Sequence, residues 1–594
     1  MCRSKPALRL LAWLDSQSHS TQVQLSPGYD SFNINPEQTP AQLTRHEPAA
    51  ISAAEHVQGH LPKEPDTQQY GQNQAHLKQL RQTGHYIKNS TAQLMYNSRR
   101  RHSDRALRQF YAHILVICEK PESCVNHIHL TAILGALAKA WAAAEACHAI
   151  QNHQQAVDDL HRFAARILGT LQPMCKALGV REASNLLSSW SKLSINPNRM
   201  VVGPLDAIAQ QLMANMHLAN GQDLAEVLAG YSVLQLTPCC ENLMQAVSRQ
   251  LAIADLTHEG SAYVSRVLYS LATIPSAAPS IKALDALCER FAVLLRSPQL
   301  AELPNAQGIA KSLWALSKLK HAPSDEVVMS MVGRMVALCH LPGQQPMPKA
   351  ISNVLLACAE LSVPVKQADT DSLASFFLSS NRRQGDEQAH TNTAWSLAVI
   401  GHLRQPQLML MLDQMLAWSV SPGQMSTPPV LTAAELNQLY QALDWLQPPP
   451  AAAAQQQSAW SSLRGKLHRL GPRPSPAKRH VSSHGKLCSA LKQLQLSFRA
   501  TVSIQSYWVD AVIECQGNKA QSIILTLSSL DYIRNVPGRL TGRAVFRTRL
   551  LAKQGRLVDV SLNMTSETTT VKQLADYLKP ILTAAAGGSL DAYR

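Results

Sequence analysis

The chain has 594 residues, which is too long for one hydrophobic core and predicts several domains or an extended array. Hydrophobic residues make up 45% of it and aromatic residues only 5%, a composition that favours helices over a sheet-dominated fold. The formal net charge of +15 makes an anionic partner the first hypothesis, although many basic proteins bind no particular anion.

No stretch approaches the roughly 20 uncharged apolar residues of a membrane-spanning helix, so we expect no membrane partner. The 12 cysteines form no C-x-x-C pair, and no cluster of His and Cys has the spacing of a metal site. We therefore expect no metal and no other cofactor. Scattered cysteines of this kind are typical of a reducing compartment.

Residues 1–104 are expected to be disordered, because they are rich in Gln, His, Ser and Pro and have weak apolar periodicity. Within this region, residues 1–14 carry three basic residues, several leucines and no acid. This pattern fits an organelle transit peptide as well as an ordinary disordered start. The basic run 99–102 is a candidate handle for phosphates, or simply a solvated tract.

One phrase returns in varied form between residues 105 and 447. It reads KSLWALSKL at 311–319 and NTAWSLAVI at 392–400, and related copies begin at residues 132, 185, 226, 266, 353 and 437. Apolar residues recur in it every three or four positions, as at Leu186, Trp190 and Leu193, which predicts a helix with one buried face.

The spacing of the copies predicts a repeat of two helices. Most copies lie about 40 residues apart, which is the length of two helices and two turns. Second amphipathic segments at 204–218, 241–253 and 325–338 lie between the copies, and prolines follow the phrase. The fold class expected for 105–447 is therefore mostly α, a right-handed type of α-solenoid built from helix pairs. A globular helical bundle with chance similarities is the alternative.

Residues 448–480 are expected to be a linker. They begin with a Pro-, Ala- and Gln-rich tract and continue with eight Lys, Arg and His residues and no acid. Such a linker would add affinity for phosphates.

Residues 481–594 predict a small α/β domain. Residues 500–515 alternate in the manner of a strand, and 522–527 form a short apolar run. A helix at 544–555 ended by Gly555, a strand at 556–562 and a final helix at 571–582 are expected to follow.

The repeated phrase resembles the first helix of the octotricopeptide repeat family, whose signature is similar to P-x-x-x-A-N-x-L-W-A-L-A-x-L. The Asn and Trp of that signature are matched by Asn185, Asn353, Asn392, Asn437, Trp314 and Trp395. The C-terminal segments YWVDAVIE, SIILTL, LTGRAVFRTRLLAKQGRLVDVSL and DYLKPIL resemble, in this order, a RAP domain. That domain commonly follows such repeats and also ends proteins of the FAST kinase domain family.

These resemblances imply sequence-selective binding of single-stranded RNA, in which each repeat offers a few side chains to one base. They also imply a role in organellar RNA processing, stability or translation, in a mitochondrion or chloroplast, with other RNA-processing proteins as further partners. A bacterial protein secreted into a host cell is the alternative location.

The candidate RNA-binding residues are polar residues that begin the phrase and arginines that match the R-x-R-x-L region of the RAP domain. They are Asn185, Arg266, Lys311, Asn353, Asn392, Asn437, Arg543, Arg547 and Arg549. A helix cap or a solvent-facing position is the alternative for the first six. For Arg547 the alternative is an internal salt bridge with Asp510.

RAP domains resemble the PD-(D/E)XK nuclease fold, in which acids on two neighbouring strands hold a metal that activates water. Asp510 matches the first acid and is the candidate catalytic residue, but Leu525–Ser529 occupies the place of the second acid. Asp531 or Glu514 would take that place only in a different register. No Walker loop, dinucleotide-binding turn or hydrolase motif occurs. We therefore expect a binding protein rather than an enzyme. An RNA endonuclease and a protein-binding α-solenoid remain as alternatives.

Overall fold

The computed structural model describes most of the chain from residue 126 onward. The described residues are 126–146, 153–193, 204–234, 239–254, 256–274, 279–297, 299, 303–380, 387–418, 431–448, 452–473, 481–515, 521–528, 532–561 and 569–593. The predictions for residues 1–104, including the targeting segment and the basic run 99–102, lie outside these residues.

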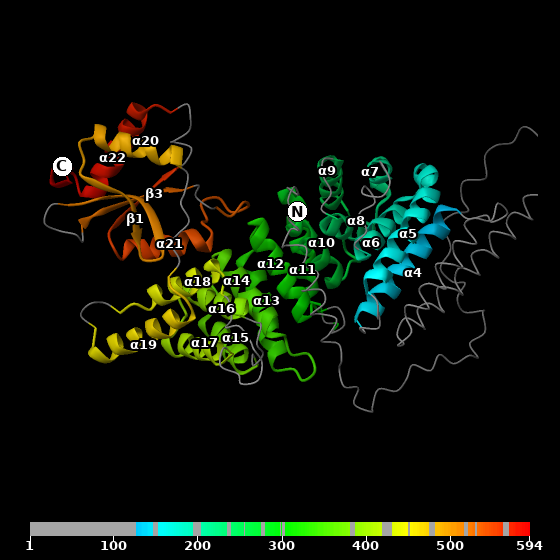
Figure 1. The fold of residues 1–594 in the computed structure, drawn as a ribbon, viewed down its shortest axis with the longest axis horizontal. Helices are drawn as coiled ribbons and strands as arrows, with labels where there is room; N and C mark the ends of the chain where they lie inside the picture. Colours follow the sequence, from blue (N-terminus) through cyan, green and yellow to red (C-terminus); the bar gives the residue numbers. More distant parts are fainter. Residues whose placement is uncertain are drawn as a thin grey trace, which may run out of the picture. The chain divides into compact units, whose positions relative to one another are not determined.

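The described chain is mostly helical and ends in a small mixed domain (Figure 1). The helices are α4 (His127–Ala146), α5 (His153–Leu171), α6 (Val180–Lys192), α7 (Pro204–Ala214), α8 (Gly221–Leu234), α9 (Cys239–Leu251), α10 (Ser261–Thr273), α11 (Ile281–Leu295), α12 (Ala306–Leu319), α13 (Asp325–Cys339), α14 (Pro348–Glu360), α15 (Gln367–Ser380), α16 (Glu387–Ile400), α17 (Gln405–Trp418), α18 (Ala433–Trp445), α19 (Ala454–Leu470), α20 (Val481–Gln493), α21 (Gly542–Ala552) and α22 (Val571–Ala586). The strands are β1 (Phe498–Ile504), β2 (Tyr507–Ile513), β3 (Ile523–Ser528) and β4 (Arg556–Ser561).

Every copy of the repeated phrase lies in a helix, as predicted. The copies fall in the even-numbered helices from α4 to α18, and the odd-numbered helices from α5 to α19 alternate with them. The second amphipathic segments at 204–218, 241–253 and 325–338 correspond to α7, α9 and α13. The helix-pair repeat is therefore confirmed at the level of the secondary structure.

The described chain divides into two compact units. One contains the residues up to Leu218 together with Ala229–Cys239, and the other contains Ala219–Leu228 and the residues from Cys240 onward. In the first unit α4 packs against α6. Gly230 of α8 lies so close to α6 that a Cβ atom there would be 2.7 Å from the Cβ of Leu187. Only a glycine, which has no Cβ atom, allows α8 and α6 to come this close.

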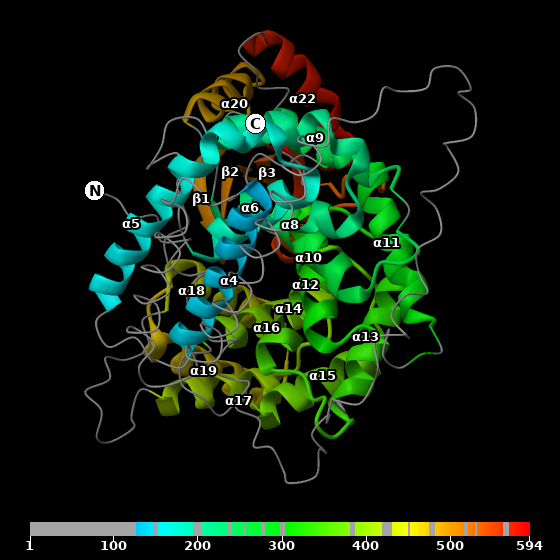
Figure 2. The ribbon, with the colours of Figure 1, turned by 90° about the vertical axis from the view of Figure 1, so that its right-hand side faces the viewer.

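In the second unit the phrase helices pack side by side, α10 against α12 and onward to α18. The odd-numbered helices α11 to α19 form a second row, and Figure 2 shows the phrase helices as the inner row of the two. Small buried side chains at the fifth position of the phrase, among them Ser270, Ala315 and Ala357, allow neighbouring inner helices to approach closely.

Polar residues at the helix starts agree with the observed boundaries. The side chain of Asn305 accepts a hydrogen bond from Gly308 N at the start of α12, and Ser324 does the same for Val327 at α13. Thr432 and Glu435 form a reciprocal capping box at α18.

Part of the predicted linker is a packed helix. Residues 454–470 form α19, which packs against α17 and α18 and buries Leu463 and Leu467 completely. Lys466 of α19 also forms an ion pair with Asp413 of α17. The helical array therefore continues beyond residue 447, the boundary expected from the sequence.

The C-terminal domain contains one four-stranded sheet in the order β1-β2-β3-β4. β1 pairs with β2 and β2 with β3 in antiparallel fashion, while β3 and β4 are parallel. The stretch 500–515 divides into two strands at Gln505, whose φ of 53° belongs to the turn between them. The predicted helix, strand and final helix are present as α21, β4 and α22, and α21 ends at Ala552, before Gly555.

Helices cover both faces of this sheet. α20 and α22 bury one face, where Leu491, Leu525 and Leu578 belong to the same core. On the other face Leu551 of α21 packs with Val512 and Ile524. Among the described residues, no helix combines the length and the hydrophobicity that a membrane span requires.

Candidate nucleic-acid interface

The residues that begin the phrase form one row across the inner helices of the second unit. Arg266 on α10 forms an ion pair with Glu226 on α8, with 2.7 Å between Nη1 and Oε1. On α12 the ammonium of Lys311 lies 5.7 Å from the centre of the Tyr269 ring of α10. The structure thus brings two of the predicted RNA-binding residues, Arg266 and Lys311, to neighbouring places.

Burial, followed by the nearby charge of Arg266, lowers the pKa of Lys311. The two cations therefore repel each other at a site that is only partly hydrated. A phosphate placed beside them would relieve this repulsion and favour the charged form of Lys311. At Arg266 the phosphate would have to compete with Glu226.

Two aromatic rings lie on the same row. Tyr269 and Trp314 stand at the fourth position of the phrase on α10 and α12, and their ring centroids are 5.3 Å apart with 32° between the planes. The ammonium of exposed Lys318 lies 5.8 Å from the centre of the Trp314 ring. Burial raises the pKa of Tyr269 to about 12, so its hydroxyl stays protonated at neutral pH. We call Arg266, Tyr269, Lys311, Trp314 and Lys318 the α10–α12 patch.

The asparagines at the first phrase position have different surroundings. Asn353 and Asn437 are half-buried on α14 and α18. Asn392 on α16 is buried, and its side-chain oxygen accepts a hydrogen bond of 3.3 Å from Gln438 Nε2. Asn185 is half-buried on α6 and belongs to the first compact unit, so it cannot be grouped with the others.

The three predicted arginines of α21 all have protein partners. Arg543 forms an ion pair of 2.6 Å with Glu360, and Arg549 donates to the carbonyl oxygen of Val399 at 2.9 Å. Buried Arg547 pairs with Asp559 at 3.1 Å, so the salt bridge expected as its alternative role exists, but with a partner other than Asp510. A phosphate would have to compete with these contacts.

Asp510 on β2 has a structural role. Its Oδ2 accepts a hydrogen bond of 2.6 Å from Leu527 N, and its Oδ1 lies 3.5 Å from Nδ1 of His484. Among the residues that the structure describes, no group of three or more His, Cys, Asp or Glu side chains could hold a metal ion. Both carboxylate oxygens of Asp510 have partners within the domain.

His484 also connects Asp510 with a thiol. Its Nε2 lies 3.5 Å from Cys488 Sγ and 3.0 Å from Thr501 Oγ1. The order Cys, His, Asp is that of a nucleophilic triad. However, burial raises the pKa of the Cys488 thiol, which keeps it in its less reactive protonated form. The cluster is therefore poorly prepared for nucleophilic catalysis.

The family models and the curated proteins compared with this chain give no match. The function is therefore inferred from the geometry of its own residues.

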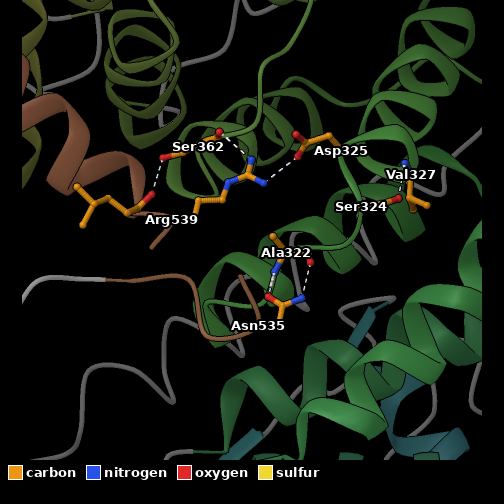
Figure 3. A network of polar contacts seen from close by, with 8 residues as sticks. Ala322, Ser324, Asp325, Val327, Ser362, Asn535 and Arg539 are labelled. Atoms are coloured by element: carbon orange, nitrogen blue, oxygen red, sulfur yellow. Dashed lines mark hydrogen bonds and ion pairs between the residues drawn. The ribbon is translucent and has the colours of Figure 1, made fainter. Parts of the chain in front are cut away.

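The C-terminal domain is bonded to the turns that follow the inner helices (Figure 3). The side-chain oxygen of Asn535 accepts from Ala322 N at 2.9 Å, and its Nδ2 donates to Ala322 O at 2.6 Å. Arg539 donates to Asp325 at 2.9 Å and to the carbonyl oxygen of Ser362 at 2.8 Å. The hydroxyl of Ser362 donates in return to the carbonyl oxygen of Leu540 at 2.9 Å.

Two of these turns have the same unusual backbone conformation. Lys320 after α12 and Ser362 after α14 have φ values of 52° and 53°, in the left-handed region that residues other than glycine rarely adopt. The carbonyl oxygen of Lys320 accepts from Arg534 N at 2.7 Å, just as that of Ser362 accepts from Arg539. The C-terminal domain therefore binds a feature that recurs along the array.

A fully buried histidine, His321, lies next to Asn535 of this network. Nε2 of His321 is 3.0 Å from Asp285 Oδ1 and 3.5 Å from Asn535 Nδ2. Burial is the main cause that lowers the pKa of His321 from its ordinary 6.5, despite the opposing effect of Asp285. The imidazole is therefore neutral in the folded protein at neutral pH.

We expect the free energy of unfolding to decrease as the pH falls below 6.5, the ordinary pKa of the imidazole. The unfolded chain takes up a proton there, while the folded chain resists protonation until a lower pH. Thermal unfolding at a series of pH values would measure this, and His321→Gln should reduce the slope below pH 6.5. The exposed His340, replaced by Gln, is the matched control. An unchanged slope in His321→Gln would contradict the assignment.

Arg266 and Lys311 were predicted as site residues, whereas Tyr269 was not, and Trp314 was predicted only as a match to the family signature. The sequence nevertheless contains a signal for this aromatic pair. The fourth phrase position is aromatic in four copies, namely Tyr269, Trp314, Trp395 and Tyr440. When the phrase helices pack side by side, residues at the same position of the phrase on successive helices become neighbours.

Proposed function

We propose that this chain binds single-stranded RNA along its row of inner helices, reads it base by base, and thereby directs the processing, stability or translation of organellar transcripts. In this proposal the array is a right-handed type of α-solenoid of octotricopeptide-like repeats, and the terminal domain is a RAP domain. The α10–α12 patch is the observation that carries the proposal.

The patch contains both kinds of group that a single strand requires. The rings of Tyr269 and Trp314 offer aromatic surface for stacking, which does not depend strongly on base identity. The cations of Lys311 and Lys318 lie beside these rings, where they can neutralise phosphates and release counterions. Arg266 can do the same where a phosphate displaces Glu226 from it. Half-buried Asn353 on the next helix offers both donors and an acceptor for a base edge.

The decisive experiment presents the full chain with a random pool of single-stranded RNA at two salt concentrations and sequences the retained molecules. We expect an enriched motif of several bases and an affinity that falls as salt rises. Double-stranded RNA of matched composition is the control and should be retained weakly. Absence of retention, or retention of both pools without a motif, would sink the proposal and favour a protein partner.

Lys318 allows a direct test of phosphate contact. Replacing Lys318 by Gln removes one exposed cation from the patch and should lower the affinity for RNA. The slope of log affinity against log salt should become shallower by about 0.7, the value for one phosphate contact on a single strand. Lys282→Gln, an exposed lysine on outer helix α11, is the matched control and should leave the slope unchanged. Equal slopes in both variants would place Lys318 outside the RNA contact.

A further inference from the structure

We propose that the C-terminal domain covers a nucleobase-stacking position at Trp395, and that the RNA-binding row of the inner helices therefore ends before α16. This inference rests on the proposed function and specifies how far along the array the RNA extends.

Aromatic residues at the fourth position of the phrase differ in their exposure from one inner helix to another. Trp395 is the fourth residue of the phrase on α16, as Trp314 is on α12 and Tyr269 on α10. Trp314 and Tyr269 are half-buried, whereas Trp395 is only 3% exposed. The same residue type in the same place on a repeated helix is thus accessible in one repeat and covered in another.

Two side chains of α21 in the C-terminal domain lie against the Trp395 ring. The guanidinium carbon of Arg543 lies 5.7 Å from the centre of the Trp395 ring. Phe546, also on α21, contacts the same ring edge-on, with 6.2 Å between centroids and 88° between planes. An arginine plane beside an aromatic ring is an arrangement that a stacked base also adopts. Arg543 and Phe546 therefore occupy the surroundings that a base would need.

One hydrogen bond to the inner row holds the edge of Trp395. Its indole N–H donates to Gln441 Oε1 of α18 at 2.7 Å. That bond joins two inner helices and involves no residue of α21. The position is therefore preorganised, and α21 decides whether a base can reach it.

Several contacts hold α21 in place. Arg543 pairs with Glu360 at the end of α14, and Arg539 pairs with Asp325 at the start of α13. Gly542, the first residue of α21, packs against the carbonyl oxygen of Ala359 with no room for a Cβ atom. The covered state is thus the state of the free protein.

The test uses the full chain, poly(U) oligomers of increasing length that carry photoreactive 4-thiouridine, and two undocking variants. The double variant Arg539→Glu, Arg543→Glu places like charges opposite Asp325 and Glu360, and Gly542→Ala creates a clash at Ala359. Hydrogen exchange of peptide 387–400 reports undocking, and circular dichroism reports retention of the helices.

We expect the unchanged protein to form cross-links on α10 and α12 and none on α16. Both undocking variants should gain cross-links on α16, and the oligomer length at which affinity stops increasing should grow by about one or two nucleotides, one per repeat that becomes accessible. Gly333→Ala on outer helix α13, where a Cβ atom meets nothing within 4 Å, is the control and should behave like the unchanged protein.

The possible failures can be told apart. Cross-links on α10 and α12 without any gain on α16 in the undocked variants would overturn this inference and leave RNA binding intact. Cross-links on α16 in the unchanged protein would also overturn it. Loss of all cross-links on α10 and α12 would contradict the proposed function itself.

Discussion

Replacing Trp314 by Ala should weaken the binding of single-stranded RNA between about 5-fold and about 150-fold, which corresponds to the roughly 1–3 kcal/mol of one base stacked on an aromatic ring. Trp314 is half-buried and lies beside the ring of Tyr269 and the ammonium of Lys318. Its removal takes away stacking surface and leaves the neighbouring cations in place. The salt dependence of binding should therefore change much less than the affinity.

A second tryptophan provides a closely matched control. Trp460 on α19 is also half-buried and has a cation, Arg464, at 5.6 Å from its ring, but it belongs to the outer row. Trp460→Ala should leave RNA affinity within about 2-fold of the unchanged protein, because no base reaches the outer row in this proposal. Equal losses in the two variants, measured by fluorescence anisotropy with a labelled oligomer, would indicate a general effect on folding and count against a stacking role for Trp314.

Gly542→Ala should destabilise the attachment of the C-terminal domain by about 3 kcal/mol or more, at the upper end of what overpacking costs. The added methyl group would overlap the carbonyl oxygen of Ala359 and approach Val399. Both groups belong to packed helices, and a backbone carbonyl cannot rotate away as a flexible side chain can. The expected result is a lower midpoint of thermal unfolding and faster hydrogen exchange in α14, α16 and α21.

Gly333→Ala tests whether the loss is specific. Gly333 lies within α13, and a Cβ atom there meets nothing within 4 Å. Alanine should stabilise this helix by about 0.5–1 kcal/mol, because glycine loses more conformational freedom on folding. If Gly542→Ala unfolded at the same temperature as the unchanged protein, the contact with α14 would be looser than the structure shows.

The repeat was predictable because each phrase carries its own signal. Spacings of four and three, as at Leu186, Trp190 and Leu193, require only the local chain to form a helix with a buried face. The interval between copies then gives the second helix and its turns. The aromatic row follows from the same reasoning, since Tyr269 and Trp314 become neighbours when two copies pack in register.

The helix α19 shows where composition misled the prediction. Its Ala- and Gln-rich start and many basic residues are typical of a linker. The spacing of Trp460, Leu463 and Leu467 by three and four is nevertheless that of an amphipathic helix, and the two leucines are fully buried. Periodicity over these few residues was a better indicator than the composition of the whole segment.

Two arginines of α21, Arg543 and Arg549, could not be placed from the sequence. Their partners are 183 residues away for Arg543 and 150 residues away for Arg549, and the second partner is a backbone carbonyl that no residue type signals. A basic residue in a basic protein suggests a phosphate partner, but a docked domain also offers acids and carbonyl oxygens. Only the packing of the chain decides between these partners.

The turns that hold the C-terminal domain also restrict how such a protein can change in length. Its bonds to Lys320, Ser362 and Val399 join it to the ends of α12, α14 and α16, and Ser506 joins it to Asp444 of α18. Loss of a helix pair within this stretch would shift the remaining helix ends along the array. They would then no longer face the arginines that bond to them. A pair gained before α10 would leave every one of these bonds intact, so the array can lengthen by duplication at its N-terminal side.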